Sequence, residues 1–306
     1  MTVLSIAEFD EDRDLETFVR LHRRIYPEQA ITVEGFRAAA PVRRGRFWVT
    51  VIGRTGDQPV GFVRAMTNPF DPSSIDVMLG VDPELRRRGY GSALADAISD
   101  RIGPRDERFV EVFLMVGDDV GRAFAEERGL RVHSTRLRLE GEANRLVVSR
   151  EIPQDYRIDR INDWRKAYEL YCSTLADNPD RISSPSYSLF RHLTVESGEF
   201  LESANVGAFL KGRLVGITLF KREGAAGGQV FYTGVLRQHR GKGLAKALKA
   251  RSIFEARRRG VASIYTYVNS ANAPMLSANE ALGFKKAGGQ WWMRTGIREM
   301  VVSKSR

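Results

Sequence analysis

Cysteine is almost absent from this sequence, because Cys172 is the only one in 306 residues. No disulfide can form within the chain, and a reducing compartment, the cytoplasm, is the expected location. No run approaches the roughly 20 apolar residues that a membrane helix needs. The first residues carry no basic segment ahead of an apolar run, so we expect neither a signal peptide nor a membrane partner.

Two common phosphate-binding motifs are also missing. The chain has no G-x-x-x-x-G-K-[ST], which excludes a P-loop. It has no G-x-G-x-x-G that opens a βαβ unit and is followed by an acidic residue, which disfavours a dinucleotide-binding fold. What is present is typical of a globular protein, with 42% hydrophobic and 28% charged residues. The length suits two domains better than one.

The charge is uneven along the chain. The net charge is +10, but residues 1–153 hold 23 Arg and 25 Asp plus Glu, or −2, which leaves +12 for residues 154–306. An excess of positive charge in one half indicates a negatively charged ligand or partner there. Nucleic-acid binding is disfavoured, because the basic residues gather on one glycine-bearing loop and the helix after it.

The chain repeats itself. GVDPELRRRGYGSAL, residues 80–94, aligns with GVLRQHRGKGLAKAL, residues 234–248, at an offset of 234 − 80 = 154. The same offset joins Gly129 to Gly283, and it drifts by one upstream, where Gly61 matches Gly216. A constant offset over some fifty residues indicates a duplication. We therefore expect two domains, residues 1–152 and 153–306.

Each half shows the same order of elements, which predicts an α/β fold. Alternating and 3.6-residue periodicities predict a strand, a helix, a strand hairpin, a further strand, a glycine-bearing loop, a helix, a strand and a last helix. The predicted helices cover residues 14–25, 91–102 and 119–129 in the first half; in the second half they cover residues 164–175, a long stretch from the glycine loop to residue 259, and residues 273–282.

The loop before the long helix in the second half has the chemistry of an anion site. The first N–H groups of a helix lack partners within the helix, and the helix dipole makes that end positive. Glycine lets the backbone approach a ligand closely, and Arg240 and Lys242 add full charges. A phosphate or pyrophosphate fits such a loop. Its pattern is R-x-x-G-x-[GA], formed by Arg240, Gly243 and Ala245.

This pattern, with VNSANAPMLSANEALGF at residues 268–284, resembles the GCN5-related N-acetyltransferases (GNAT), in tandem and over nearly the whole chain. The resemblance implies two GNAT domains, each a mixed, mostly antiparallel sheet flanked by helices. A splayed strand pair in each would admit acetyl-CoA, and no metal is expected. The implied coenzyme-binding residues are Val235, Arg237, Arg240, Gly241, Lys242, Gly243, Leu244, Ala245 and Asn272, with Val235 and Arg237 acting through their backbones.

The first half departs from the family pattern. Asp118 stands where the second half has Asn272, and Ala125 stands where it has Asn279. We therefore expect the first half to be degenerate in its chemistry. Its basic loop is intact, however, and can still hold coenzyme A through the following residues: Val81, Arg86, Arg88, Gly89 and Gly91.

The acid and base of the second half are not marked clearly. Many family members carry a tyrosine four residues before the Gly-Phe glycine, as acid for the leaving thiolate, and here that residue is Asn279. Asparagine cannot deliver a proton, so we expect it to position the coenzyme. The amine must be neutral before it attacks the thioester. The candidate bases are Glu199, its neighbours Glu196 and Glu202, and Tyr232.

The resemblance therefore predicts an acyltransferase. We expect direct transfer of an acetyl group from acetyl-CoA to a primary amine of a small molecule, in the second half, within a ternary complex. The alternative is a coenzyme-A-binding regulator or pseudoenzyme, suggested by the missing acid and base. A monomer is expected, because tandem halves can replace a dimer.

Overall fold

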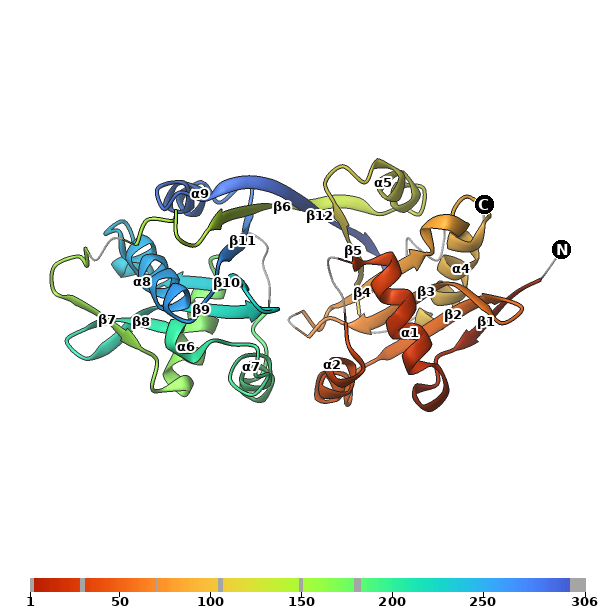
Figure 1. The fold of residues 1–306 in the computed structure, drawn as a ribbon, viewed down its shortest axis with the longest axis horizontal. Helices are drawn as coiled ribbons and strands as arrows, with labels where there is room; N and C mark the ends of the chain where they lie inside the picture. The colour runs from red at the N-terminus through yellow and green to blue at the C-terminus, as the bar shows by residue number, and fades with distance from the viewer. Residues whose placement is uncertain are drawn as a thin grey trace. The chain divides into compact units, whose positions relative to one another are not determined.

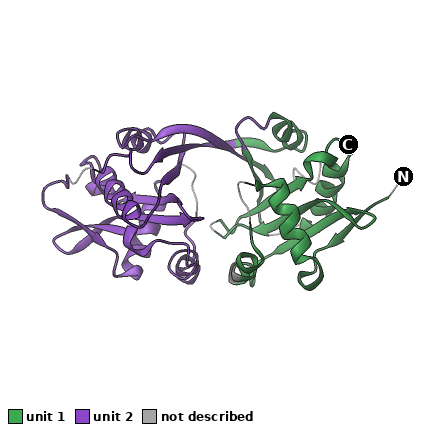
Figure 2. Cartoon of the chain, in the orientation of Figure 1, with its two compact units in different colours: residues 1–114, 119–132, 293–306 green, residues 115–118, 133–292 purple. Residues whose placement is uncertain are grey.

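A computed structural model describes residues 3–27, 31–69, 71–103, 107–148, 151–178 and 183–297. The chain forms two compact units, coloured separately in Figure 2. Unit 1 consists of residues 1–114, 119–132 and 293–306, and unit 2 of residues 115–118 and 133–292.

Unit 1 is built on a mixed, mostly antiparallel sheet (Figure 1). Its strand order is β1-β2-β3-β4-β5-β12, with β4 parallel to β5 and the pairs before them antiparallel. The elements in chain order are β1 (Leu4–Glu8), α1 (Glu11–Ile25), α2 (Val33–Ala38), α3 (Ala40–Arg43), β2 (Trp48–Thr55), β3 (Gln58–Thr67), β4 (Ser74–Val81), the 3-10 turn η2 (Pro83–Leu85), α4 (Tyr90–Ile102), β5 (Phe109–Met115), α5 (Asp119–Glu126) and β6 (Arg131–Glu142).

Unit 2 repeats this plan. Its strand order is β6-β11-β10-β9-β8-β7, with β10 parallel to β11 and the other pairs antiparallel. The elements are β7 (Tyr156–Arg160), α6 (Trp164–Leu175), α7 (Tyr187–Thr194), η3 (Glu202–Ala204), β8 (Val206–Leu210), β9 (Arg213–Glu223), β10 (Gly227–Val235), η4 (Arg237–His239), α8 (Leu244–Arg258), β11 (Ser263–Asn269), α9 (Ala273–Glu280) and β12 (Lys285–Gly296). The α/β fold predicted for both halves is confirmed, and the six predicted helices are present.

Two strands cross between the units. Residues 133–142 of β6 belong to unit 2, where β6 pairs antiparallel with β11 from Arg136 to Glu142. The end of β12, Met293–Gly296, belongs to unit 1, where β12 follows β5 in the strand order. The compact units therefore differ from residues 1–152 and 153–306, because residues 115–118 and 133–152 group with unit 2 and residues 293–306 with unit 1.

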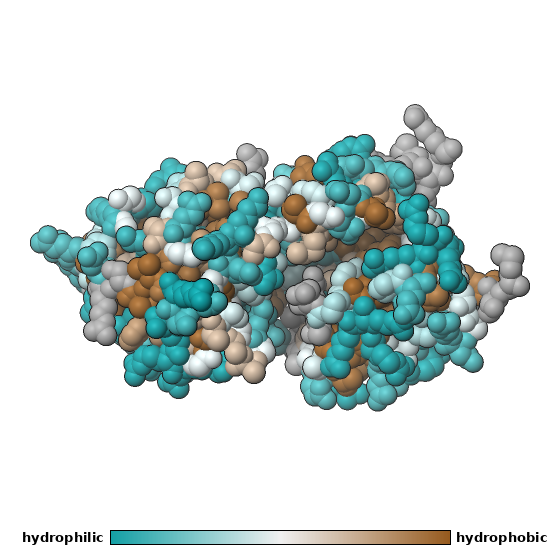
Figure 3. Space-filling model, turned by 45° about the horizontal axis from the view of Figure 1, so that its top comes forward, coloured by the Kyte–Doolittle hydropathy of each residue, from teal (hydrophilic) through white to brown (hydrophobic). Residues whose placement is uncertain are grey.

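Helices cover both faces of each sheet. In unit 1, Leu94 and Ile98 of α4 pack in one core cluster, while Phe18 of α1 packs with Phe62 in another. In unit 2, α8 packs on one face through Leu248 and Ile253, and α6 packs on the other. Burying one such side chain contributes about 1.5–3 kcal/mol. On the face drawn in Figure 3, hydrophilic residues interrupt the hydrophobic ones. None of the described helices could cross a membrane.

The parallel pair of each sheet diverges, as the resemblance implied. In unit 2, β10 and β11 pair only from Gly227 to Gln229, although β10 continues to Val235. A β-bulge then interrupts the pairing of β10 with β9 at Phe231. In unit 1, β4 and β5 pair only from Ser74 to Asp76. Beyond these residues the two strands of each pair no longer hydrogen-bond to each other, which suits the addition of an extended ligand between them.

Candidate functional site

The glycine-bearing loop of unit 2 joins β10 to α8 with an open backbone. Gly241 has φ +74° and Gly243, the N-cap of α8, has φ +77°. A Cβ atom at either glycine would meet nothing within 4 Å, so glycine serves the left-handed conformation rather than tight packing. No side chain caps α8, which leaves its first N–H groups for an anion. Leu244 and Ala245 begin this 15-residue helix.

The arginines of the loop are held in place by backbone and carboxylate contacts. Arg240 donates from Nε to the carbonyl of Val235 at 2.8 Å, which ties the loop to the end of β10. Arg237 and Arg240 each donate to a different oxygen of Asp177, both at 2.8 Å. These two guanidinium groups hold the pKa of Asp177 below its usual range. Both arginines are thus oriented before any ligand binds.

A second contact group lies beside the loop. The hydroxyl of Tyr156 lies 3.0 Å from Nδ1 of His239, and Lys242 donates to the same hydroxyl at 3.4 Å. Asn272 lies at the start of α9, where its side-chain oxygen accepts from the N–H of Met275 at 3.2 Å. The asparagine therefore caps that helix, and its contact with the coenzyme stays a prediction.

Asn279 is fully buried, and both ends of its amide have partners. Its Oδ1 accepts from Nζ of Lys249 at 2.8 Å, and its Nδ2 donates to the carbonyl of Met275 at 2.9 Å. Lys249 is itself only 2% exposed, and burial lowers its pKa to about 7. We did not predict this lysine, although its spacing from Ser252 and Ala256 on α8 placed it on the buried face.

Tyr232 lies on β10 just beyond the bulge. Its hydroxyl pairs with Oγ1 of Thr174 at 2.7 Å, and its ring packs on Tyr171 with centroids 4.5 Å apart. Burial raises the pKa of Tyr232 to about 12, so the phenol is protonated at neutral pH. A protonated phenol can donate a hydrogen bond, but it is a poor base.

Glu199 lies ahead of β8 and points to the same stretch of sheet. Its carboxylate contacts Nζ of Lys221 on β9 at 2.8 Å. The ring of the next residue, Phe200, meets the bulge residue Phe231 edge-on at 5.5 Å. The other two candidate bases have different surroundings. Glu196 forms an ion pair with Arg191 at 3.1 Å, and Glu202 is the first residue of η3.

The loop of unit 1 keeps the shape of its counterpart. Gly89 has φ +82° and is the N-cap of α4, and a Cβ there would meet nothing within 4 Å. Arg86 donates to the carbonyl of Val81 at 3.3 Å, the same link that Arg240 makes in unit 2. Arg87 has φ +63°, where unit 2 has Gly241.

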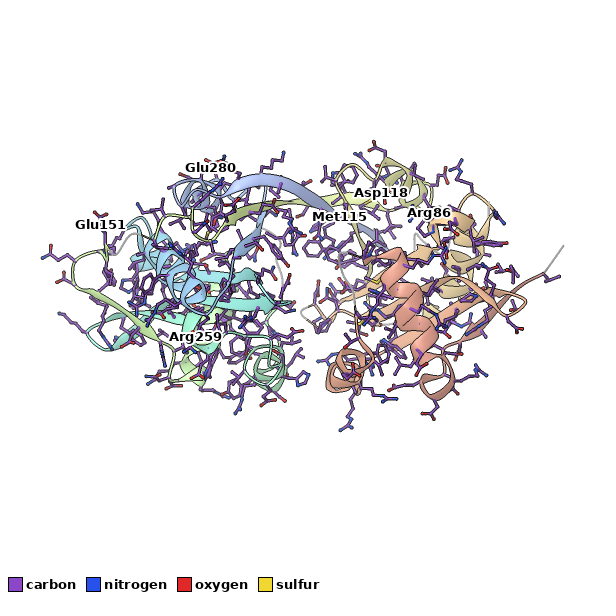
Figure 4. The ribbon with its side chains drawn as sticks, viewed as in Figure 1. Arg86, Met115, Asp118, Glu151, Arg259 and Glu280 are labelled. Atoms are coloured by element: carbon purple, nitrogen blue, oxygen red, sulfur yellow. The ribbon has the colours of Figure 1, made fainter. Side chains whose placement is uncertain are left out.

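Other positions of unit 1 differ in chemistry. Figure 4 labels Arg86 in the loop and Asp118 just ahead of α5. Arg88 is exposed, Gly91 is the second residue of α4, and Ala125 is buried. Among the described residues, no three His, Cys, Asp or Glu side chains come together as metal ligands.

Comparison with known proteins places this geometry in a family. A mycothiol acetyltransferase of Thermobispora bispora is 28% identical over 243 residues, which cover 76% of this chain and 78% of that protein. The mycothiol acetyltransferase of Clavibacter michiganensis subsp. michiganensis is 27% identical over 254 residues, 78% of this chain and 76% of its own.

Solved structures share the fold. A tandem GNAT protein from the clavulanic acid biosynthesis pathway superposes with a TM-score of 0.78, at 19% identity, covering 96% of this chain and 99% of its own. A GCN5-related N-acetyltransferase from Sphaerobacter thermophilus gives a TM-score of 0.77, at 18% identity, covering 96% of each chain. The acetyltransferase (GNAT) family model matches twice, at residues 12–130 and 162–284. The chain therefore belongs to the GNAT family, as a tandem acetyltransferase that uses acetyl-CoA as its donor.

Proposed function

We propose that this chain moves the acetyl group of acetyl-CoA directly to a primary amine of a small molecule, with the chemistry in unit 2. The main observation in support of this proposal is that three features of unit 2 lie next to one another. The open loop at Gly243, the arginines held by Asp177 and the diverging strands β10 and β11 follow one another along a single path. Such a path fits a pyrophosphate at one end and an extended pantetheine arm at the other.

Within this path we assign the backbone of Val235 and Arg237 to the pantetheine arm. One N–H there would polarise the thioester carbonyl as charge develops on its oxygen. We assign Glu199 as the base that takes the proton of the amine, because Phe200 contacts the bulge where the strands open. Tyr232, protonated and bonded to Thr174, orients the acceptor instead.

The leaving thiolate takes its proton from water in this proposal. Asn279 has no proton to give, and both ends of its amide are engaged by Lys249 and Met275. A thiol pKa near 8.5 makes the thiolate a tolerable leaving group. Asn279 therefore acts by fixing α9 against α8, on the side of the sheet where the coenzyme enters.

The remaining assignments are also proposals. We propose a cytoplasmic monomer whose halves, residues 1–152 and 153–306, act as one catalytic and one degenerate domain. The relatives named mycothiol acetyltransferase support a small-molecule acceptor. Light scattering coupled to size exclusion tests the monomer, and a mass of about twice the chain would contradict it.

The function is tested by transfer assays over a panel of small primary amines. The assay measures the release of free coenzyme A with a thiol reagent. Release is expected with at least one amine. It is expected to be lost in Gly243→Asp but kept in Gly89→Asp. Intact mass after acetyl-CoA alone is expected to be unchanged. Binding of acetyl-CoA with no transfer to any amine would favour the regulator, and a stable gain of an acetyl group would refute direct transfer.

A further inference from the structure

A group of charged residues crosses the α1 side of the unit 1 sheet. Arg64 on β3 lies opposite Met78 on β4, and Asp76 on β4 lies beside Glu111 on β5. Asp76 and Glu111 are the last residues of β4 and β5 that pair with each other before the two strands diverge. The group therefore stands at the mouth of the opening, on the face that α1 crosses in Figure 1.

Three buried polar atoms around this point have no partner in the described structure, although the other carboxylate oxygen of Glu111 accepts from Ser74 at 3.0 Å and from Arg294 at 2.6 Å. Nδ1 of His22, Oγ1 of Thr50 and Oε2 of Glu111 are all unpaired, and none of the three residues is more than 2% exposed. Thr50 lies directly opposite Arg64 across β2 and β3, and the His22 ring stacks on Phe62 at 5.6 Å. Leaving such groups unpaired is costly, which points to a ligand that satisfies them.

Arg64 adds a positive charge without a hydrogen bond. The hydrogen bonds among the described residues include none to its guanidinium, although Asp76 and Arg43 lie close enough to act on it electrostatically. Burial lowers the pKa of Arg64. Asp76 accepts from Asn68 at 3.0 Å, and burial, followed by the charge of Glu111, raises the pKa of Asp76 to about 7. A cation and a carboxyl thus lie on the same face of the sheet without a hydrogen bond between them.

These charges are specific to unit 1. Phe62 pairs with Gly80 in unit 1, and Ile217 pairs with the equivalent glycine, Gly234, in unit 2. Arg64 lies two residues after Phe62, so its counterpart in unit 2 is Leu219, two residues after Ile217. At the last paired rung, Gln229 and Tyr265 stand where unit 1 has its two carboxylates. The shared coenzyme path of the two units does not require these charges. They therefore serve something other than the pantetheine arm.

The distance between Arg64 and Asp76 indicates the class of ligand that could contact both side chains. Asp76 is a diagonal cross-strand neighbour of Arg64, and such neighbours lie about 7–8 Å apart at their backbones. Arginine binds carboxylate in a planar fork, and a carboxylate binds an ammonium group. We propose that unit 1 binds a free α-amino acid at this point, with its carboxylate on Arg64 and its ammonium group on Asp76. This proposal does not depend on transfer chemistry in unit 2.

The test is calorimetric titration of the full chain with each of the twenty amino acids in turn. At least one is expected to bind, and its decarboxylated amine and its deaminated acid are expected to bind at least tenfold more weakly. Arg64→Met and Asp76→Asn are each expected to weaken binding at least tenfold. Arg54→Gln is the matched control, because Arg54 lies on β2 in the same unit and is already paired with Asp14 at 3.0 Å.

Stability separates binding from a structural role. Arg64 has no hydrogen bond to lose, so the melting temperature of Arg64→Met is expected to equal or exceed that of the parent. Asp76→Asn keeps the shape of the side chain and serves as the second variant if the first fails to fold. The proposal is overturned if no amino acid binds, or if binding is unchanged in both variants.

Discussion

Gly243 is the position at which the anion-binding role of the unit 2 loop can be measured most directly. Its φ of +77° strains any residue with a Cβ, yet a Cβ there meets nothing within 4 Å. Gly243→Asn and Gly243→Asp therefore carry the same backbone strain, about 1–2 kcal/mol, and no clash. They differ in one charge, which Gly243→Asp would place at the N-terminus of α8, where we propose that the pyrophosphate of the coenzyme binds.

The charge dominates the expected loss of affinity. Two unit charges about 4 Å apart interact by about 4 kcal/mol at an effective dielectric constant of 20. Each 1.4 kcal/mol is a tenfold change in affinity, so Gly243→Asp is expected to bind acetyl-CoA roughly 10²–10³-fold more weakly than Gly243→Asn. The melting temperatures of both variants are expected to fall together, by a few degrees for a chain of this size.

Isothermal titration of acetyl-CoA into the parent and the two variants measures this difference. Raising the salt concentration is expected to narrow the gap, because salt screens exposed charges. Equal affinities for Gly243→Asn and Gly243→Asp would refute the anion-binding role of the loop. A drop in both variants without a difference between them would mean that backbone strain alone governs binding.

Further predictions follow from other residues. Gly89→Asp is expected to leave turnover within twofold of the parent in steady-state assays, and a loss equal to that of Gly243→Asp would place chemistry in unit 1. Asn279→Ala is expected to lower stability by about 1–3 kcal/mol in urea unfolding, because it strips buried Lys249 of its hydrogen-bond partner, and to slow turnover less than tenfold. The pKa of Lys249 is about 7 folded and 10.5 unfolded, so the unfolded chain binds the extra proton between these values. Stability is therefore expected to rise with pH across that window, by up to about 5 kcal/mol, and the rise should vanish in Lys249→Met. Cys172→Ala is expected to keep full activity, and a large loss would point to an acyl-enzyme.

Local sequence patterns were sufficient to predict the order of helices and strands that the two halves share. The glycine spacing and the basic residues of GKG and RGYG predicted a loop ahead of each long helix, and both loops are present; that Gly89 and Gly243 are left-handed is known only from the structure. Periodicity predicted the six major helices, because an amphipathic stripe depends only on neighbours three and four residues away. The short helices α2, α3 and α7 were not predicted.

Only the tertiary structure decided which strands and side chains meet. The pairing of β6 with β11 joins residues more than 120 positions apart, and no local pattern selects that partner over another strand of similar composition. The same holds for Lys249 and Asn279, which lie on different helices and share one buried hydrogen bond. Arg64, Asp76 and Glu111 each read as ordinary strand residues in the sequence, because a polar side chain in an alternating strand is normally solvated. The fold brings them together because β3, β4 and β5 are neighbours in one sheet and because β4 and β5 stop pairing at Asp76 and Glu111, which is a property of register rather than of composition.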